Sequence, residues 1–292
     1  MIENNYARAM IGGKIVVSAV DAAAIVNKAI AYHKLSPIAA EALGRCLTVA
    51  ALMGKQLKND GDYMSATVDG GGSLGKITVC SNDKGEVKGT VDEPFCPSVY
   101  RADGSLDVGA AVGKNGKITV VKDVGLKQPY VGACEMVSGE IAQDFAAYFA
   151  RSEQQPCALT LGLSFKNGKC VSGGGVLVQV LPGCDDALLE DVETTLYAMD
   201  EMSYQFSLHG AREVLEKFFG GYDGFFVTDE GVCKYKCDCS AKRIKRIIYN
   251  LGKAEAESIV AEQGAIEVQC HFCNKKYSFD GQQVAKLFEK SK

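Results

Sequence analysis

The sequence lacks the features that mark membrane, secreted and polyanion-coating proteins. No apolar run approaches the roughly 20 residues that a membrane-spanning helix needs. The N-terminal stretch MIENNYARAMIGGKIVV has no basic stretch leading into an apolar segment, so it does not resemble a secretory signal. Lys and Arg number 32 against 36 Asp and Glu, a net charge of −4, which excludes a chain that binds nucleic acid through its overall charge. We therefore expect a cytoplasmic protein without a membrane partner.

Signals for catalysis are also scarce. The stretch Gly70–Lys76 (GGGSLGK) matches the first seven positions of a phosphate-binding P-loop, but Ile77 follows where Ser or Thr would hold magnesium. The residues from Lys76 to Cys80 alternate like a strand, so no helix N-terminus is directed at a phosphate. No Ser-His-Asp set or carboxylate pair can be placed. We expect no nucleotide site and no enzymatic activity.

The chain has 292 residues, 47% of them hydrophobic and 23% charged, the balance of a soluble globular protein. Residues 1–182 predict an α+β body, a mixed sheet with helices. Ser36 and Pro37 are typical of the start of a helix, whose apolar positions continue to Met53. A second helix is predicted over residues 138–151, and strands over residues 63–68, 76–80, 86–91, 158–165 and 176–181. The pentapeptide GKITV occurs at 75–79 and 116–120, which suggests paired strands of one sheet.

A change of composition after Pro182 marks a second segment, residues 183–227. From Cys184 to Ala211 there are seven acidic residues and no Lys or Arg. Apolar residues at helical spacing predict an acidic amphipathic helix, and a second short apolar stripe ends at Gly220. We interpret this segment as a helical linker that packs on the body through its apolar side. That side includes Leu188, Leu196, Met199, Phe218 and Phe219.

The twelve cysteines are many for a chain in a reducing compartment. Seven are scattered singly, at positions 46, 80, 96, 134, 157, 170 and 184, and are interpreted as small buried hydrophobic residues. The other five lie near the C-terminus, in residues 228–292. Four of these form two close pairs, Cys237 with Cys239 and Cys270 with Cys273, and thirty residues separate the pairs.

Two close cysteine pairs at this spacing are typical of a tetrahedral Zn²⁺ site, because each pair supplies two thiolates from one tight turn. Four protein ligands leave no open position for water, which favours a structural zinc over a hydrolytic one. We predict one Zn²⁺, bound in the reduced form by the four paired cysteines, in a small zinc-binding domain over residues 228–292. His271 is interpreted as a bystander and Cys233 as a spare thiol.

Two other classes of protein stay open at this point. The helix predicted over residues 241–251 is basic, which favours a zinc-ribbon protein that binds nucleic acid or associates with the ribosome. Two observations argue against this class. Aromatic residues are not interleaved with the basic residues. The net charge of the tail, residues 228–292, is +3, and it falls to about +1 when four thiolates and one Zn²⁺ are counted. A thiol–disulfide oxidoreductase is disfavoured, because its Cys-x-x-Cys pair is expected at a helix start rather than opposite a second pair.

The sequence resembles the redox-regulated heat-shock chaperones of the 33 kDa chaperonin family. The C-x-C and C-x2-C pairs, with Ser240 after the first pair, resemble the zinc signature of that family. Three more stretches agree, at residues 137–144 (VSGEIAQD), 152–156 (SEQQP) and 175–183 (GVLVQVLPG). Length and segment order match as well, so the resemblance covers essentially the whole chain. The additional cysteines, Cys233 above all, depart from the family pattern.

The resemblance implies an ATP-independent holdase that binds unfolding or oxidatively damaged proteins and prevents their aggregation. Oxidation would join Cys237 to Cys239 and Cys270 to Cys273, release the zinc and loosen the middle segment, and the activated form would be a homodimer. We further expect the zinc-folded tail to shield the acids of the linker and hold it down. The tail residues involved would be Lys242, Arg243, Lys245 and Arg246. Opening of the linker would expose a client-binding area at Leu188, Leu196, Met199, Phe218 and Phe219.

Overall fold

The computed structural model describes residues 4–199 and 201–289. The chain divides after Lys236 into two compact units. The first unit contains two β-sheets with helices, and the second is a small unit that carries the paired cysteines. The predicted fold class is confirmed: a mixed α+β body, a helical middle segment and a small C-terminal unit with four clustered cysteines.

The first sheet has five antiparallel strands in the order β10 (Phe226–Gly231), β1 (Tyr6–Ile11), β2 (Ile15–Asp21), β9 (Lys169–Val180) and β8 (Cys157–Lys166). Strands β8 and β9 form one long hairpin. Its turn consists of Asn167 and Gly168, both with positive φ, and Asn-Gly is the preferred pair for such a two-residue turn. Strand β8 is an edge strand of this sheet, because it pairs with β9 alone.

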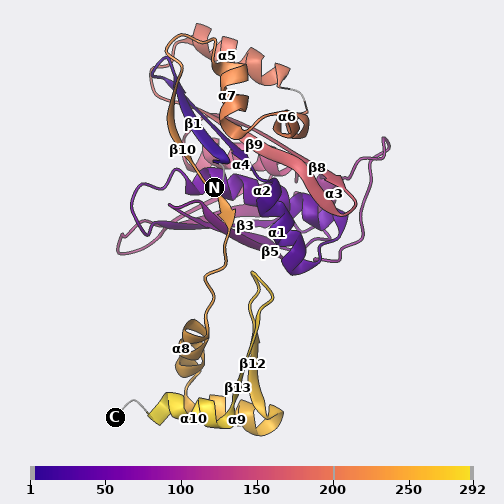
Figure 1. Ribbon diagram of the computed structural model, residues 1–292, viewed down its shortest axis with the longest axis vertical. Coiled ribbons are helices and arrows are strands. Elements are labelled where there is room, and N and C mark those ends of the chain that lie inside the picture. The colour runs from indigo at the N-terminus through magenta and orange to yellow at the C-terminus, as the bar shows by residue number, and fades with distance from the viewer. Residues whose placement is uncertain (1–3, 200, 290–292) are drawn as a thin grey trace. The chain divides into compact units, whose positions relative to one another are not determined.

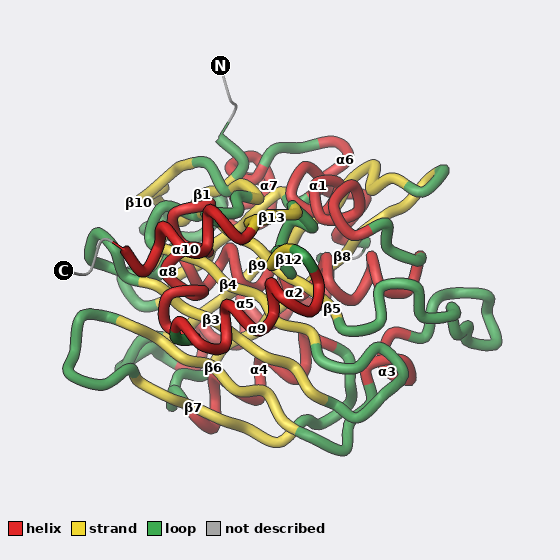
Figure 2. The backbone as a smooth tube through the Cα atoms, turned by 90° about the horizontal axis from the view of Figure 1, so that it is seen from below, coloured by secondary structure: helices red, strands yellow, loops and turns green. Residues whose placement is uncertain are grey.

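The second sheet has six strands, most of which can be followed side by side in Figure 2. Their order is β11 (Lys234–Tyr235), β5 (Glu86–Val91), β4 (Ile77–Asn82), β3 (Tyr63–Asp69), β6 (Lys117–Asp123) and β7 (Tyr130–Glu135). All neighbours are antiparallel except β11 and β5. The two GKITV copies lie in β4 and β6, which both pair with β3 and not with each other. The repeat thus marks strands of one sheet, as expected, but not paired strands.

Helix α2 (Pro37–Gly54) forms the centre of the first unit. The Ser36 hydroxyl accepts a hydrogen bond from the Ala39 amide at 3.4 Å, which is the N-cap that the sequence predicts. Leu43 and Leu47 are fully buried in a core that both sheets share. Among the described residues, α2 alone is long and apolar enough to cross a membrane, judged by its length and composition. Because 89% of it is buried inside the fold, its apolar composition is that of a core helix.

Three further helices complete this core. They are α1 (Ala23–His33), α3 (Val108–Val112) and α4 (Ile141–Ser152). Helix α4 is amphipathic, and it buries Phe145, Tyr148 and Phe149 against the same core as α2. The predicted helix over residues 138–151 is therefore confirmed with a start three residues later.

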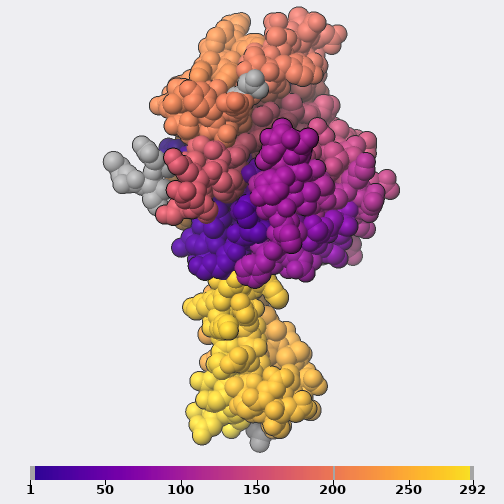
Figure 3. All heavy atoms as spheres, turned by 90° about the vertical axis from the view of Figure 1, so that its right-hand side faces the viewer, coloured from indigo at the N-terminus to yellow at the C-terminus, as the bar shows by residue number. Residues whose placement is uncertain are grey.

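Helices α5 (Asp186–Ala198), α6 (Met202–Leu208) and α7 (Ala211–Phe219) cover the other face of the first sheet (Figure 1). Figure 3 shows this segment, in orange tones, gathered on one part of the first unit. Val192 and Val214 pack on a sheet face that includes Val17. Met199 and Phe219 are buried, and the other three apolar residues singled out in this segment, Leu188, Leu196 and Phe218, are partly buried in the same cluster. The apolar side of the segment packs on the body, as expected.

Residues 228–236, which the sequence places in the C-terminal domain, lie in the first unit. The Cys233 amide donates to Asn5 Oδ1 at 2.7 Å, and the Asn5 side-chain amide donates to the Cys233 carbonyl at 3.0 Å. The buried Tyr235 hydroxyl donates to the Gly89 carbonyl at 2.9 Å. The contact boundary therefore falls nine residues after the boundary inferred from composition. The roles of the segments 1–182, 183–227 and 228–292 stay predictions.

The second unit begins at Cys237 and contains α8 (Ala241–Leu251), α9 (Lys253–Gln263), the hairpin of β12 (Ala265–Gln269) and β13 (Lys276–Asp280), and α10 (Gly281–Glu289). The bounds of α8 are those expected from the sequence. Its core is small: within the described residues it contains seven buried hydrophobic side chains, among them Ile248, Ala256 and Phe279. A core of this size gives marginal stability, because small units bury only a modest fraction of their surface.

Candidate metal centre

The first cysteine pair lies where the chain enters the second unit. Cys237 and Cys239 precede α8, and Ser240 is the N-cap of that helix. The Ser240 hydroxyl accepts a hydrogen bond from the Arg243 amide at 3.3 Å. The Arg243 guanidinium in turn binds the Asp238 carboxylate between the two cysteines at 2.7 Å. The cap and the ion pair fix the turn that carries this pair.

The second pair lies in the loop of the β12–β13 hairpin. The Cys270 amide donates to the Lys275 carbonyl at 3.0 Å, and the Asn274 amide donates to the Cys270 carbonyl at 2.8 Å. Asn274 has a φ of 56°, a left-handed conformation that asparagine tolerates better than most residues. These bonds fold the loop into a tight turn, which directs the Cys270 and Cys273 side chains to the same side.

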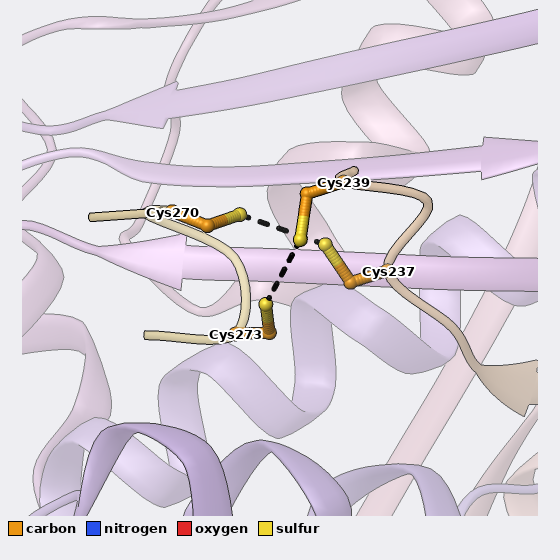
Figure 4. A group of neighbouring side chains, drawn as sticks. All are labelled: Cys237, Cys239, Cys270 and Cys273. Carbon is orange, nitrogen blue, oxygen red and sulfur yellow. Dashed lines mark hydrogen bonds between the residues drawn. The ribbon is translucent and has the colours of Figure 1, made fainter. Parts of the chain in front are cut away.

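The four sulfur atoms meet at one point (Figure 4). All lie within 4.8 Å of one another. The Cys237 and Cys270 sulfurs are 3.6 Å apart, and the Cys239 and Cys273 sulfurs are 3.4 Å apart. A tetrahedral ion with Zn–S bonds of about 2.3 Å would place its sulfurs about 3.8 Å apart. The four cysteines therefore fit a metal ion of this size and coordination, and they can hold one.

The surroundings of the cluster favour negative charge on the Cys239 sulfur. The Tyr277 hydroxyl donates to the Cys239 sulfur at 3.2 Å. Burial alone would raise the pKa of Cys239, but the hydrogen bonds from Tyr277 and the neighbouring thiols outweigh it and lower that pKa. Burial, with the hydrogen bonds to neighbouring sulfurs, raises the pKa of Cys237 instead. Cysteine ligands bind a metal ion as thiolates, so a bound cation would favour the charged form of all four.

Comparison with known proteins identifies the family. Residues 5–280 match the model of the family described as Hsp33 protein. The chain belongs to the Hsp33 family. This family's name and the names of its members describe heat-shock chaperones, so the chain is a heat-shock chaperone whose partners are client proteins.

Individual relatives of the Hsp33 family agree over nearly the whole chain. The 33 kDa chaperonin of Alkaliphilus metalliredigens is 40% identical over 268 residues, which covers 91% of each chain. The 33 kDa chaperonin of Clostridium perfringens is 38% identical over 283 residues, 95% of this chain and 88% of that one. The crystal structure of the 33 kDa chaperonin from Thermotoga maritima superposes with a TM-score of 0.89 at 32% identity and covers 98% of both chains.

The remaining cysteines lie outside the cluster of this Hsp33 chain. Cys233 is buried in the core of the first unit, where burial raises the pKa of its thiol to about 12. Burial also raises the pKa of Cys157 and of Cys170 to about 12. Thiols with such values stay protonated near neutral pH and react slowly with oxidants. The four clustered cysteines are half-buried. Of the seven scattered cysteines interpreted as buried, five are buried, whereas Cys157 and Cys184 are half-buried.

The glycine-rich stretch that resembles a P-loop has a packing explanation. It is followed by strand β4 rather than by a helix. A Cβ atom on Gly70 would lie 2.2 Å from the Gly113 carbonyl oxygen, and one on Gly72 would lie 2.3 Å from the Ala111 carbonyl oxygen. These glycines therefore allow the turn to pack against the backbone at the C-terminal end of α3. His271, next to two of the clustered cysteines in sequence, is not part of the four-sulfur group.

Proposed function

We propose that this Hsp33 chain is an ATP-independent holdase in the cytoplasm, activated by oxidation of its four clustered cysteines and release of one Zn²⁺. The observation that carries the proposal is the convergence of four half-buried sulfurs within 4.8 Å, from two turns of a unit with a small core. When bound, Zn²⁺ would hold four thiolates together and supply about 10 kcal/mol or more of folding free energy. The residues that would bind it are Cys237, Cys239, Cys270 and Cys273.

The proposed oxidation removes the charge that a cation needs. Each pair of thiolates gives two electrons to one molecule of H₂O₂, which also takes up two protons from water; the products are one S–S bond and two molecules of water. The disulfide sulfurs no longer carry negative charge, so they do not retain a metal ion. The second unit then has only its small core to stabilise it. We infer that it unfolds.

Unfolding of the second unit would weaken the middle segment of the first. Helix α5 has Val192 as its single buried residue, and α6 has seven residues in all. Such short, shallowly packed helices depend on tertiary contacts and open at low free-energy cost. The acids of α5 have no ion pair within the described residues, and we propose that Lys242, Arg243, Lys245 and Arg246 shield them in the reduced form. Exposed pairs contribute only about 0–1 kcal/mol each, so packing must supply most of the coupling.

The client-binding area would then consist of apolar side chains released from the first sheet. Phe219 and Met199 are buried in the structure, and their exposure would uncover the sheet face that they pack on. A contiguous exposed apolar surface of this kind binds unfolded chains. The set proposed for client binding is Leu188, Leu196, Met199, Phe218 and Phe219. A homodimer is proposed as the activated form.

Oxidation should join neighbours in sequence, Cys237 to Cys239 and Cys270 to Cys273. The chain already holds each pair close, so closing these short loops costs little entropy. The sulfurs of opposite pairs are also close, Cys237 to Cys270 and Cys239 to Cys273. Disulfides between the two pairs are therefore the alternative that the experiment must distinguish. Peptide mapping by mass spectrometry after peroxide treatment measures it. A dominant bridge between the two pairs, or one to Cys233, would show that the proposed pairing is wrong.

The function itself is tested by light scattering of a thermally unfolding client protein. Reduced, zinc-loaded protein should leave aggregation almost unchanged, and protein treated with peroxide and heat should suppress it at near-stoichiometric amounts. Protein re-reduced with dithiothreitol in the presence of Zn²⁺ is the matched control and should lose the activity. Equal suppression by reduced and oxidised protein would refute the redox switch, and no suppression by either form would refute the holdase.

A further inference from the structure

The four clustered sulfurs differ in the hydrogen bonds that they accept. Cys239 accepts a hydrogen bond from the Tyr277 hydroxyl at 3.2 Å. Cys237 and Cys273 accept hydrogen bonds from the backbone, at Cys239 and Lys275 respectively. Among the described residues outside the cluster, Tyr277 alone has a side chain that donates to one of the four sulfurs. Cys239 is therefore the one sulfur with a side-chain donor of its own.

The core of the second unit fixes the position of this hydroxyl. Tyr277 lies in β13, opposite Val268 of β12, and its side chain is buried among the apolar residues of the unit. It follows Cys273 by four positions, in the hairpin that carries the second cysteine pair. Its hydroxyl nevertheless donates to a sulfur of the first pair, 38 positions away in the chain. The hydrogen bond thus joins the two halves of the cluster.

A neighbouring cation strengthens the Tyr277 hydroxyl as a donor. The Lys275 ammonium lies over the face of the Tyr277 ring, 5.2 Å from the ring centre. A cation in this position attracts the electrons of the ring, which leaves the hydroxyl hydrogen more positive. Hydrogen bonds to an ionised acceptor are about twice as strong as bonds between neutral groups. Tyr277 therefore favours Cys239 as a thiolate over Cys239 as a thiol.

This hydrogen bond changes how the Cys239 sulfur reacts. With a metal ion bound, all four cysteines would be thiolates, so their nucleophilicity distinguishes them rather than the fraction that is ionised. Oxidation begins when a thiolate gives an electron pair to one oxygen of H₂O₂: an S–O bond forms, the O–O bond breaks and hydroxide leaves. A hydrogen bond that stabilises the thiolate makes it a weaker nucleophile. Cys239 should thus react more slowly than the other three.

We propose that Tyr277 is a positioning residue of the metal centre, whose hydroxyl holds the Cys239 sulfur in the cluster and lowers its reactivity toward oxidants. The inference rests on the metal centre of the proposed function. It assigns to one side chain outside the ligand set a control over how readily that centre is oxidised. Without the hydroxyl, the centre would hold its metal less tightly and lose it at a lower peroxide concentration.

Alkylation of reduced, zinc-loaded, full-length protein with iodoacetamide tests the reactivity of each sulfur. The reagent takes the same electron pair from sulfur and releases iodide, and mass spectrometry reads the rate at each cysteine. In the unmodified protein, Cys239 should be the slowest of the four to react. Tyr277→Phe should speed alkylation of Cys239 about threefold and leave the rates at the other three unchanged.

Co²⁺ in place of zinc gives a second, spectroscopic readout. A thiolate without its hydrogen bond holds its electrons less tightly, so Tyr277→Phe should move the sulfur-to-cobalt charge-transfer band to longer wavelength. The same variant should weaken metal binding about tenfold in competition with a chelator. Tyr249→Phe is the matched control, because it removes a hydroxyl from the same unit, on a ring that stacks on Phe288. It should change neither the band nor the affinity.

Two results would overturn the proposal. The first is alkylation of Cys239 as fast as that of Cys273 in the unmodified protein, a comparison that stands even if Tyr277→Phe folds poorly. The second is an equal acceleration at all four cysteines in Tyr277→Phe with an unchanged band, which would show that Tyr277 only supports the core of the unit. These readouts use reduced protein without a client, so failure here leaves the holdase proposal standing, and failure of the aggregation assay leaves these readouts unchanged.

Discussion

Replacing any one of Cys237, Cys239, Cys270 or Cys273 with serine should lower zinc affinity by more than about 100-fold and unfold residues 237–292. Removal of an outer-shell partner alone typically costs 10–100-fold in metal affinity, and loss of a thiolate ligand removes a direct bond. The second unit buries too few hydrophobic side chains to compensate for about 10 kcal/mol of metal-binding free energy. Zinc content per chain after dialysis measures the first effect, and amide exchange in α8 and β12 measures the second.

Cys233→Ser is the matched control for these variants. Cys233 is buried in the first unit with its amide bound to Asn5, and its thiol is outside the four-sulfur group. This variant should therefore bind one zinc per chain with unchanged affinity, and any cost should fall on the stability of the first unit. Loss of zinc in Cys233→Ser equal to that in Cys237→Ser would show that the ligand set is wrong.

Oxidation should remove the hydrogen-exchange protection of residues 186–219 while the centre of the first unit stays protected. The middle segment is made of short helices, and α5 has a single buried residue. Helix α2 is almost wholly buried between two sheets and should exchange only by global unfolding. We expect protection in α5 to α7 to fall at least about tenfold, a change of at least about 1.4 kcal/mol in opening free energy. Peptide-level exchange of reduced and oxidised protein measures both regions in one experiment.

Helix α2 and strand β3 serve as internal controls for that comparison, because both lie in the shared core of the first unit. If they lose protection together with α5 to α7, oxidation unfolds the whole first unit and no selective switch exists. A middle segment that keeps its protection in a form that already suppresses aggregation would contradict the proposed route to the client-binding area.

The parts of the fold that the sequence predicts well are those that depend on residues close together in the chain. The Ser36 cap, the basic face of α8 and the spacing of the paired cysteines each depend on residues within a few positions of one another. The cysteine spacing was specific for the same reason, since two tight turns already determine which sulfurs can share an ion. Comparison with relatives then supported the family on residues 5–280.

Pairings between distant segments could not be read from local pattern. Strand β10 is rich in polar residues and pairs with β1, more than 200 positions away. Tyr235 is held by Gly89 and lies two residues before the first clustered cysteine, so composition alone assigned it to the wrong side of the boundary. The apolar composition of α2 likewise resembles a membrane span until its burial between two sheets is known.

We propose that loss of the metal and gain of chaperone activity are one event. The most direct measurement follows zinc release, with a coloured chelating indicator, and client light scattering in the same peroxide-treated sample over time. One zinc per chain should be released with the same half-time as the rise of aggregation suppression. Full suppression before any zinc appears, or complete zinc release from a form that never suppresses aggregation, would contradict it.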